Sequence, residues 1–516
     1  MNGLFSLLLR LCLFLFASAA VAQDVTLTSR DGSMVIEGAI TSFDGEYYQI
    51  DSTYGELTLD ATGVTCEGPG CPSVDDFVAR IRVTGAEVVG QTLLPALIRA
   101  FEEEEGLTLH RISYTDNLFV LQLKDDAGQL IAEFFFDLGT ASEGFEALET
   151  GTADIVLSAR EITDAEAERL LAADVGDMRE ARRSRIIALD AVLPIVSPNS
   201  EVRAISAATL LGIMAGEIDN WIDISGDDAP INLILPAPDS SLGHVLRAQF
   251  GVDSYPEGVT IISDPDLLAD LVLRDPFALG LTRMSEQGSA RPLPLTGECG
   301  AEMAATELNI KTEDYPLPAP LFIYTPAQRL PRIARAFLKF LDGAAANRAV
   351  SRYGFVDQLI SGIPLNAQGP RLALAIQQAG EEISLSDLQA VSSEMQRSDR
   401  LSLSFRFEPG SSNLDAQSRA NVRRLAEILE AGEFDGQELL FAGFSDGEGA
   451  ADANLTIALR RAEAVLTAVR DAAELMDEER VTLRAQGFGE ALPIACDDSE
   501  WGRQSNRRVE LWVHRP

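Results

Sequence analysis

The sequence predicts a multidomain α/β protein with three folded parts in series. The chain has 516 residues, which is room for about three or four domains. Short apolar runs separated by turns fill its beginning, and strand-like and helix-like patterns alternate over most of the remainder. Hydrophobic residues make up 46% of the chain, which suffices for large cores and argues against global disorder.

Residues 1–22 predict a secretory signal peptide. Leu4 to Phe16 is apolar apart from Arg10, and Ala20-Val21-Ala22 offers a small-x-small cleavage site before Gln23. This stretch is short for a membrane span, and no other segment reaches about 18 apolar residues. We therefore expect a mature chain outside the cytoplasm with no transmembrane span.

Residues 23–72 predict a small β domain. Strand-like runs such as VTLTS, MVIEGAITSF and YYQIDS alternate with turns at Asp31-Gly32, Asp44-Gly45 and Tyr54-Gly55. Strands at a spacing of about 8–12 residues favour a small barrel, SH3-like in size. No pattern in this part carries chemistry, which leaves an interaction surface or a spacer as its role.

The cysteines gain meaning because an exported chain meets an oxidising compartment. Cys66 and Cys71 flank the turn-forming sequence Glu-Gly-Pro-Gly, so we expect a local disulfide between them. Cys299 and Cys496 are either two buried free thiols or a bridge between domains, and the sequence leaves both open.

Composition excludes several function classes. The formal net charge of −39, from 41 Lys and Arg against 80 Asp and Glu, argues against nucleic acid and against anionic lipid as partners. The three histidines are scattered, which speaks against a zinc site. Neither a nucleophile elbow nor a P-loop is present, so we expect neither an enzyme nor a cofactor.

Residues 78–368 predict a two-lobed α/β domain. Strand-like VLPIV (192–196) and INLIL (231–235) alternate with helical patterns over 92–105 and 332–349. A domain of this size suits two lobes around a cleft, and such clefts are common ligand sites.

Motifs along this segment point to a known family. They are Thr84-Gly85-Ala86, Gly139 to Phe145, Gly151 to Ile155, Ser197-Pro198-Asn199, Leu211 to Trp221, Leu321 to Tyr324 and Phe337 to Phe340. With them the segment resembles the periplasmic phosphate-binding proteins of ABC importers. The resemblance implies an anion held by backbone N–H groups at helix starts, by hydroxyls and by an Arg.

The positions that the resemblance assigns to phosphate depart from the family's pattern. Val89 stands where a Thr is expected, Ala159 lies at or beside the expected Asp, and Ala237 lies near the expected Arg. Glu87 adds a negative charge near the first helix. We therefore expect phosphate to bind weakly or not at all.

Several polar residues survive as candidates for an anion-type cleft. They are Thr84, Gly85, Thr140, Ser142, Ser158, Arg160, Ser240 and Ser241. Arg160 either replaces the lost cation or pairs with a local carboxylate. Ser and Thr at turns are more often helix caps than ligands.

Residues 369–400 predict a helical connector, and residues 401–516 predict an α+β sandwich. The connector has few Gly or Pro residues and is expected to hold its neighbours in a fixed relation. After it, Leu401, Leu403 and Phe405 alternate with polar residues, as in a half-buried strand. The pattern that follows predicts the order strand-helix-strand-helix-strand.

Asp446 and Arg461 are the residues of the last domain that point to chemistry. Asp446 ends a predicted strand and Arg461 lies in the next helix, a pair that can grip the ammonium and carboxylate of a zwitterion. Taken alone, such a pair is more often an ordinary surface ion pair.

The flanking sequence of this pair carries a signature. It consists of Asn454, Gly487 to Glu490, Gly502-Arg503 and Asn506 to Glu510. Residues 401–513 thereby resemble the OmpA-like peptidoglycan-binding domain. The resemblance implies that Asp446 and Arg461, with Asn454 nearby, bind the diaminopimelate of the cell-wall stem peptide.

Two functions fit these predictions. The first is a periplasmic solute-binding protein of the phosphate-transporter type, anchored non-covalently to peptidoglycan near the outer membrane of a Gram-negative bacterium. Its partners would be peptidoglycan, a small anion and an ABC permease. The second is an envelope-organising protein, without a transport role, whose two-lobed domain has lost its anion site and binds a protein partner.

Overall fold

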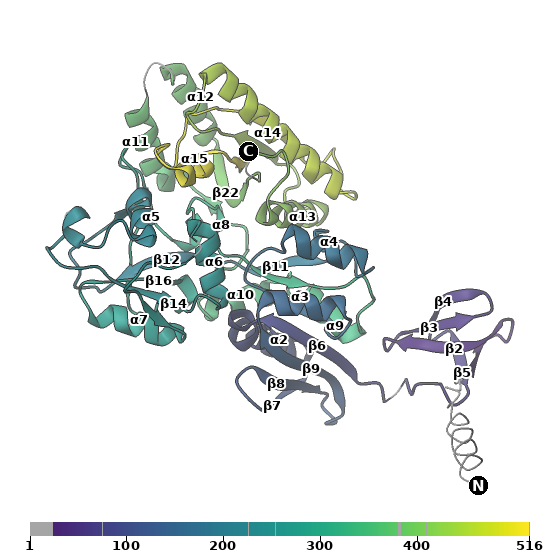
Figure 1. Cartoon of the computed structure of the whole chain (residues 1–516). Helices are drawn as coiled ribbons and strands as arrows, with labels where there is room; N and C mark the ends of the chain where they lie inside the picture. Colours follow the sequence, from purple (N-terminus) through teal and green to yellow (C-terminus); the bar gives the residue numbers. More distant parts are fainter. Residues whose placement is uncertain are drawn as a thin grey trace, which may run out of the picture.

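The computed structural model describes residues 24–514 apart from 75, 225, 253, 380–382 and 409. It shows a small β domain, a two-lobed α/β domain and a C-terminal α+β domain in chain order (Figure 1). The signal peptide predicted over 1–22 lies outside the described residues. Within the described residues, no helix is long and apolar enough to cross a membrane.

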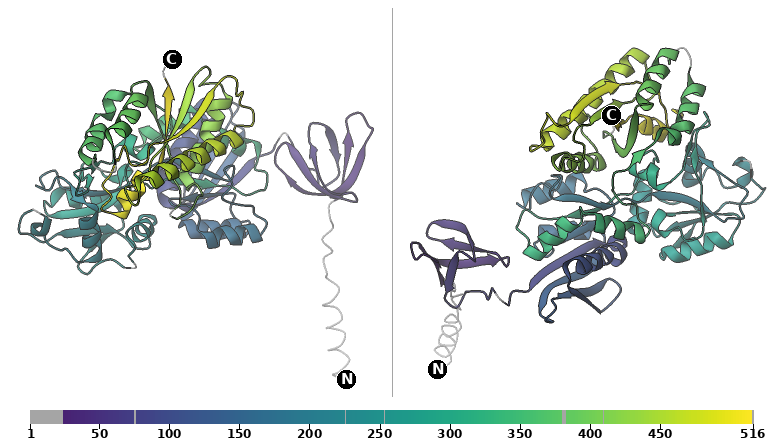
Figure 2. Two further views of the ribbon diagram at one scale, coloured as in Figure 1. Left: turned by 90° about the horizontal axis from the view of Figure 1, so that it is seen from above. Right: turned by 180° about the vertical axis from the view of Figure 1, so that it is seen from behind.

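The small domain is one antiparallel sheet of five strands, set to one side of the rest of the chain in every view (Figures 1 and 2). In the order β4-β3-β2-β1-β5, its strands are β1 (Asp24–Ser29), β2 (Val35–Phe43), β3 (Tyr47–Ser52), β4 (Gly55–Asp60) and β5 (Val64–Glu67). Each strand pairs with the next in this order, but the two edge strands β4 and β5 are not paired with each other in the described sheet. The barrel therefore remains a prediction. A disulfide joins Cys66 to Cys71.

The first lobe of the α/β domain is built on a seven-stranded sheet of order β11-β20-β10-β6-β9-β8-β7. Its strands are β6 (Ala79–Ala86), β7 (Thr108–Ser113), β8 (Leu118–Lys124), β9 (Leu130–Gly139), β10 (Ile155–Ser158), β11 (Ser184–Ala188) and β20 (Leu321–Tyr324). Its helices are η1 (Val89–Leu93), α2 (Leu94–Glu105), α3 (Ala141–Glu149), α4 (Asp164–Ala172), α9 (Arg332–Phe340) and α10 (Ala344–Arg352). The helix predicted over 332–349 is interrupted at Gly343, which caps the start of α10.

The second lobe is built on a five-stranded sheet of order β15-β14-β16-β12-β17. Its strands are β12 (Val192–Val196), β14 (Asn232–Pro236), β15 (Thr260–Ile262), β16 (Ala278–Arg283) and β17 (Arg291–Pro292). A small three-stranded sheet adds β13 (Ile205–Ser206), β18 (Leu295–Thr296) and β19 (Glu302–Met303). The helices are α5 (Ala207–Ala215), η2 (Trp221–Ile224), α6 (Ser241–Phe250), α7 (Pro265–Arg274), η3 (Met284–Glu286) and α8 (Glu307–Lys311).

The C-terminal sheet has the order β21-β22-β25-β23-β24. Its strands are β21 (Gly362–Ile363), β22 (Ser398–Phe405), β23 (Glu438–Gly443), β24 (Thr482–Gly487) and β25 (Val509–His514). Its helices are η4 (Leu365–Gln368), α11 (Gly369–Gln378), α12 (Leu385–Met395), α13 (Ala416–Glu430), α14 (Ala451–Ala472) and α15 (Glu500–Asn506).

The strand order predicted for this domain lacked β24 and the helix α15. Within β24, TLRAQG, Leu483 is the one large apolar residue, and the strand lies at the sheet edge with its residues only partly buried. An edge strand that buries little need not alternate, so the period-2 signal was absent.

Both faces of the C-terminal sheet are covered, because alternate residues along β23 enter different cores. Leu439 and Phe441 pack under α13 and α14, whereas Leu440 and Ala442 face α11 and α12. Figure 2 shows α14 lying along the sheet. The segment predicted as a connector thus supplies the second layer of this domain.

The C-terminal domain is docked on the two-lobed domain through buried polar contacts. The guanidinium of Arg400 donates to both carboxylate oxygens of Asp314, at 2.7 and 3.0 Å, and that of Arg406 donates to the carbonyl of Glu313 at 2.6 Å. These four side chains are buried. A disulfide between Cys299 and Cys496 crosses the same interface, which resolves the open question about these two thiols.

Candidate functional sites

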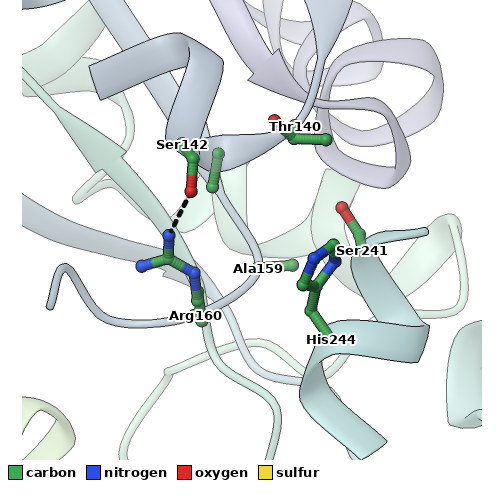
Figure 3. Close-up of a pocket in the computed structure, with 7 residues that line it drawn as sticks. Thr140, Ser142, Ala159, Arg160, Ser241 and His244 are labelled. Atoms are coloured by element: carbon green, nitrogen blue, oxygen red, sulfur yellow. Dashed lines mark hydrogen bonds between the residues drawn. The ribbon is translucent and has the colours of Figure 1, made fainter. Parts of the chain in front are cut away.

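A small polar cavity lies between the lobes, where the starts of two helices converge (Figure 3). Its volume is about 140 Å³, and it is lined by Thr140, Ala141, Ser142, Ala159, Arg160, Ser241 and His244. The first three residues begin α3 of the first lobe, and Ser241 and His244 belong to the first turns of α6 in the second. Helix starts offer N–H groups and a partial positive charge, as an anion requires.

The cation of this cavity is already paired. Arg160 donates to both carboxylate oxygens of Glu166, at 2.8 and 2.7 Å, and to the Ser142 hydroxyl at 3.0 Å (Figure 3). Burial acts to raise the pKa of Glu166, but the hydrogen bonds from Arg160 and Thr163 outweigh it and lower the pKa to about 2. Of the two roles left open for Arg160, the structure shows the pairing with a local carboxylate.

Three of the predicted hydroxyls bond to nearby parts of the chain. Thr140 caps α3, and its hydroxyl donates a hydrogen bond to the carboxylate of Glu143 at 2.9 Å. Ser240 caps α6, accepting from the Gly243 N–H at 3.0 Å. The fully buried Ser158 donates to the carbonyl of Arg160 at 2.6 Å. These hydroxyls shape the turns around the cavity.

Thr84 and Gly85 lie in β6 and do not line the small cavity. Gly85 has φ of +111°, and a Cβ there would lie 2.1 Å from the carbonyl oxygen of Leu157 on β10. The glycine is therefore required for strand packing.

A second, larger cleft adjoins the small cavity. It has a volume of about 670 Å³ and is lined by residues of both lobes, among them Ser240 and Ser241. Glu87, whose negative charge was predicted to repel an anion, also lines it. The cleft also contains Thr282, Arg283 and Glu286, which the sequence reasoning missed. Burial, partly offset by Arg283, raises the pKa of Glu286 to about 7.

In the C-terminal domain, Asp446 follows the end of β23 and is largely buried. Its carboxylate accepts a hydrogen bond from Arg507 at 2.7 Å, and Arg507 also pairs with Glu500. The sequence reasoning placed Arg507 in the signature but gave it no role. Its proximity to Asp446 could not be read from the spacing, because 61 residues separate them.

Arg461 reaches the same site from α14, where it is half-buried. Burial and the nearby charge of Arg507 lower its pKa, and Asp446 opposes this shift. Within the described chain, Arg461 forms no ion pair within 4.0 Å, and its guanidinium lies 5.8 Å from the ring centre of Phe407. A carboxylate and a cation with free donors thus stand at one edge of the sheet.

Asn454 supports this site from behind. Its side-chain amide donates to the carboxylate of Glu490 at 2.6 Å and to the carbonyl of Glu448 at 3.1 Å, and the residue is buried. It therefore fixes the loop after β23 against the loop after β24. The structure thus shows the Asn454 amide bonded to these two loops.

The closing signature is largely structural. The side chain of Asn506 accepts from the N–H groups of Ile494 and Ala495, at 2.9 and 3.2 Å. Arg508 is fully buried and donates to Glu510 at 2.7 Å. Burial lowers the pKa of Arg508 to about 9, against the effect of Glu510.

Comparisons with known families agree with both resemblances. Residues 72–343 match the family model described as "PBP superfamily domain", and residues 406–507 match that of the OmpA family. The two resemblances predicted from the sequence are thereby confirmed.

Curated relatives cover the same two regions. The phosphate-binding protein PstS of Borreliella burgdorferi is 21% identical over 230 residues, covering 43% of this chain and 78% of that protein. The probable lipoprotein YiaD of Escherichia coli is 30% identical over 105 residues, covering 20% of this chain and 45% of the relative. The chain thus spans less than half of the latter.

Solved structures also resemble the two-lobed domain. An ABC-type phosphate transport receptor from Vibrio cholerae shares 18% identity at a TM-score of 0.41, covering 54% of this chain and 99% of that one. A putative phosphate ABC transporter substrate-binding protein from Clostridium perfringens shares 17% identity at a TM-score of 0.41, again covering 54% of this chain and 99% of that one. Because the match over 72–343 takes up more than half of the sequence, the chain belongs to the PBP superfamily.

Proposed function

We propose that this protein binds a solute in the cleft between its lobes while its C-terminal domain holds it non-covalently at peptidoglycan. The observation that carries the proposal is that Asp446 and Arg461 lie near each other at one edge of a domain that is bonded to the solute-binding domain. Arg461 has no ion pair among the residues that the structure describes. The location that follows is the periplasm of a Gram-negative bacterium, beside the wall.

The chemistry of this edge fits diaminopimelate, which carries ammonium and carboxylate groups. Asp446 would accept hydrogen bonds from the ligand ammonium, and Arg461 would donate a fork of N–H groups to its carboxylate. Arg507 holds Asp446 in place before the ligand arrives. The ammonium would then share Asp446 with Arg507.

Co-sedimentation with purified sacculi tests the wall-binding part. Asp446→Ala and Arg461→Ala should each fall to background, because truncating one partner of a buried charged contact costs about 2–5 kcal/mol. Arg460→Ala is the matched control, since Arg460 is the exposed neighbour of Arg461 on α14. Full retention of both site variants would refute the assignment.

The solute-binding part is proposed without phosphate as the ligand. Arg160 pairs with Glu166, and the hydroxyls of Thr140, Ser158 and Ser240 bond to their own loops. A desolvated anion whose donors are missing loses several kcal/mol. Delivery to an ABC permease is the transport role that this family relation suggests.

The neutralised cavity also favours a second candidate function. A cavity whose cation is paired internally suits an envelope-organising protein whose two-lobed domain binds a protein partner. Calorimetry separates the two functions, since the second predicts that no small molecule binds between the lobes of the full chain.

A further inference from the structure

The larger cleft contains a buried arginine without a partner. Arg283 ends β16, is 1% exposed and lines the cleft, and neither of its terminal guanidinium nitrogens has a hydrogen-bond partner among the described residues. The adjacent Thr282 is also fully buried, and its hydroxyl likewise has no hydrogen-bond partner among the described residues. Buried donors of this kind are normally satisfied, so the two residues together mark a place for a ligand group.

Carboxylates near Arg283 balance its charge without bonding to it. Asp190 accepts from the Ser285 hydroxyl at 2.6 Å and from the Ala191 N–H at 2.8 Å. Neither Asp190 nor Glu286 approaches within the 4.0 Å of an ion pair in the described structure. The guanidinium therefore has no bonded carboxylate within the described structure, although its fork of N–H groups suits a planar one.

The rest of the cleft is acidic. Arg283 is the one Lys or Arg among the described residues that line it, whereas Glu87 and Asp116 come from the first lobe and Asp264, Asp266 and Glu286 from the second. A simple anion would meet repulsion from these side chains, while an ammonium group would be attracted to them. The cleft thus combines one buried guanidinium in the second lobe with carboxylates from both lobes.

We propose that this cleft binds an amino-carboxylate with an excess of ammonium groups, the class of basic amino acids and short basic peptides. Its carboxylate would lie on Arg283 and Thr282, and its ammonium groups would lie against the acidic side chains of both lobes. This inference rests on the proposed solute-binding function and names the ligand class for it.

Calorimetry on the mature, disulfide-intact chain tests the proposal with L-lysine as probe. Cadaverine is the same chain without the carboxylate, and glutarate replaces the ammonium groups by a second carboxylate. We expect L-lysine to bind and both analogues to bind at least about tenfold more weakly, because each loses one half of the recognition. Inorganic phosphate should give no heat.

Variants locate the binding. Arg283→Met, which keeps an unbranched side chain but removes the guanidinium, should weaken L-lysine binding about 100-fold. Thr282→Val is the second variant, since it preserves shape and leaves Arg283 in place; it should weaken L-lysine about tenfold. Arg274→Met, at the exposed end of α7, is the matched control and should bind as the parent does.

The proposal would be overturned by no heat with L-lysine, by equal affinity for cadaverine, or by unchanged affinity in folded Thr282→Val and Arg283→Met proteins. Heat that is lost in Arg461→Ala and kept in Arg283→Met would assign L-lysine to the wall site and also overturn it. Sacculus binding is read out separately, so failure here leaves the wall-binding part of the proposed function standing.

Discussion

At the scale of single residues, three arginines differ in whether a neighbouring carboxylate forms an ion pair with them. Arg160 is held by both oxygens of Glu166, whereas Arg461 and Arg283 form no ion pair in the described structure. A guanidinium that is paired internally must give up its partner before it can bind an anion. The difference is the reason why we propose ligand contacts for Arg461 and Arg283 rather than for Arg160.

The pairing of Arg160 can be tested by removing its partner's charge. Glu166→Gln should leave a net positive charge in the small cavity and strengthen sulfate or phosphate binding about tenfold over the parent. Glu168→Gln is the matched control, because Glu168 is exposed on the same helix. Anion titrations by calorimetry that show no gain in Glu166→Gln would contradict the idea that pairing silences this cavity.

Glu286 gives a pH dependence whose sign follows from its pKa. The pKa is raised from 4.5 to about 7, so between these values the unfolded chain loses this proton while the folded chain keeps it. The contribution of Glu286 to folding therefore becomes unfavourable as pH rises from about 4.5 to 7. Glu286→Gln should be more stable than the parent by about 2 kcal/mol at pH 8 and nearly equal at pH 4.

Urea unfolding at the two pH values provides the measurement for Glu286. A difference between parent and variant that stays the same from pH 4 to pH 8 would show that the carboxyl group has an ordinary pKa.

The sequence was sufficient to single out residues but not to reveal their partners. Asp446 and Arg461 could be predicted because a local signature surrounds them. Arg283 has no such signature, because it became a candidate only through its burial without a bonded partner. Its neighbour Asp190 lies more than 90 positions away in the sequence, so their proximity could not be predicted. The pairing of Arg160 with Glu166 was only one of two options, because the five residues between them do not fix the shape of the turn.

At the scale of elements, glycines decide how closely α14 lies on the C-terminal sheet. A Cβ on Gly443 of β23 would lie 2.0 Å from the carbonyl oxygen of Ala458, and one on Gly487 of β24 would lie 2.7 Å from that of Leu455. This close approach brings Arg461 on the helix to Asp446 at the end of the strand.

Gly443→Ala should therefore separate α14 from β23. We expect a loss of about 3 kcal/mol or more in the free energy of unfolding, together with weaker sacculus binding. Gly369→Ala at the start of α11 is a suitable control, because a Cβ there meets nothing within 4 Å. Equal unfolding midpoints for the two variants would rule out close packing as the reason for Gly443.

Elements with strong periodicity were predictable, and weak ones were not. Strand β12 was expected over the residues that form it, 192–196, because five consecutive apolar residues fill a buried strand. Strand β24 was not predicted, because its side chains are only partly buried and give no alternating apolar pattern. The helices of 369–400 were expected, but their layer was not, since nothing local tells which sheet face a helix covers.

At the scale of the whole molecule, the disulfide and buried ion pairs hold the last two domains together. Cys299 and Cys496 are 197 residues apart in the sequence, so their bond closes a long loop. Breaking such a bond typically costs about 2–5 kcal/mol. The cleft between the lobes is thereby kept in one orientation to the site of Asp446 and Arg461.

Peptide mapping without reductant should find Cys299 linked to Cys496, and Cys66 linked to Cys71. Cys496→Ser should lower the unfolding midpoint and make the C-terminal domain easier to release by limited proteolysis. Free thiols at 299 and 496 in the secreted protein, or identical proteolysis of parent and variant, would argue against a covalently joined pair of domains.

We propose that the C-terminal domain holds the protein at the wall by recognising diaminopimelate. Competition measures this most directly: sacculi loaded with the full chain are washed with free meso-diaminopimelate or, in parallel, with cadaverine. We expect diaminopimelate to release the protein with rising concentration, cadaverine to release little, and Arg461→Ala to show no retention to begin with. Retention that diaminopimelate leaves unchanged, and that Arg461→Ala preserves, would contradict the account.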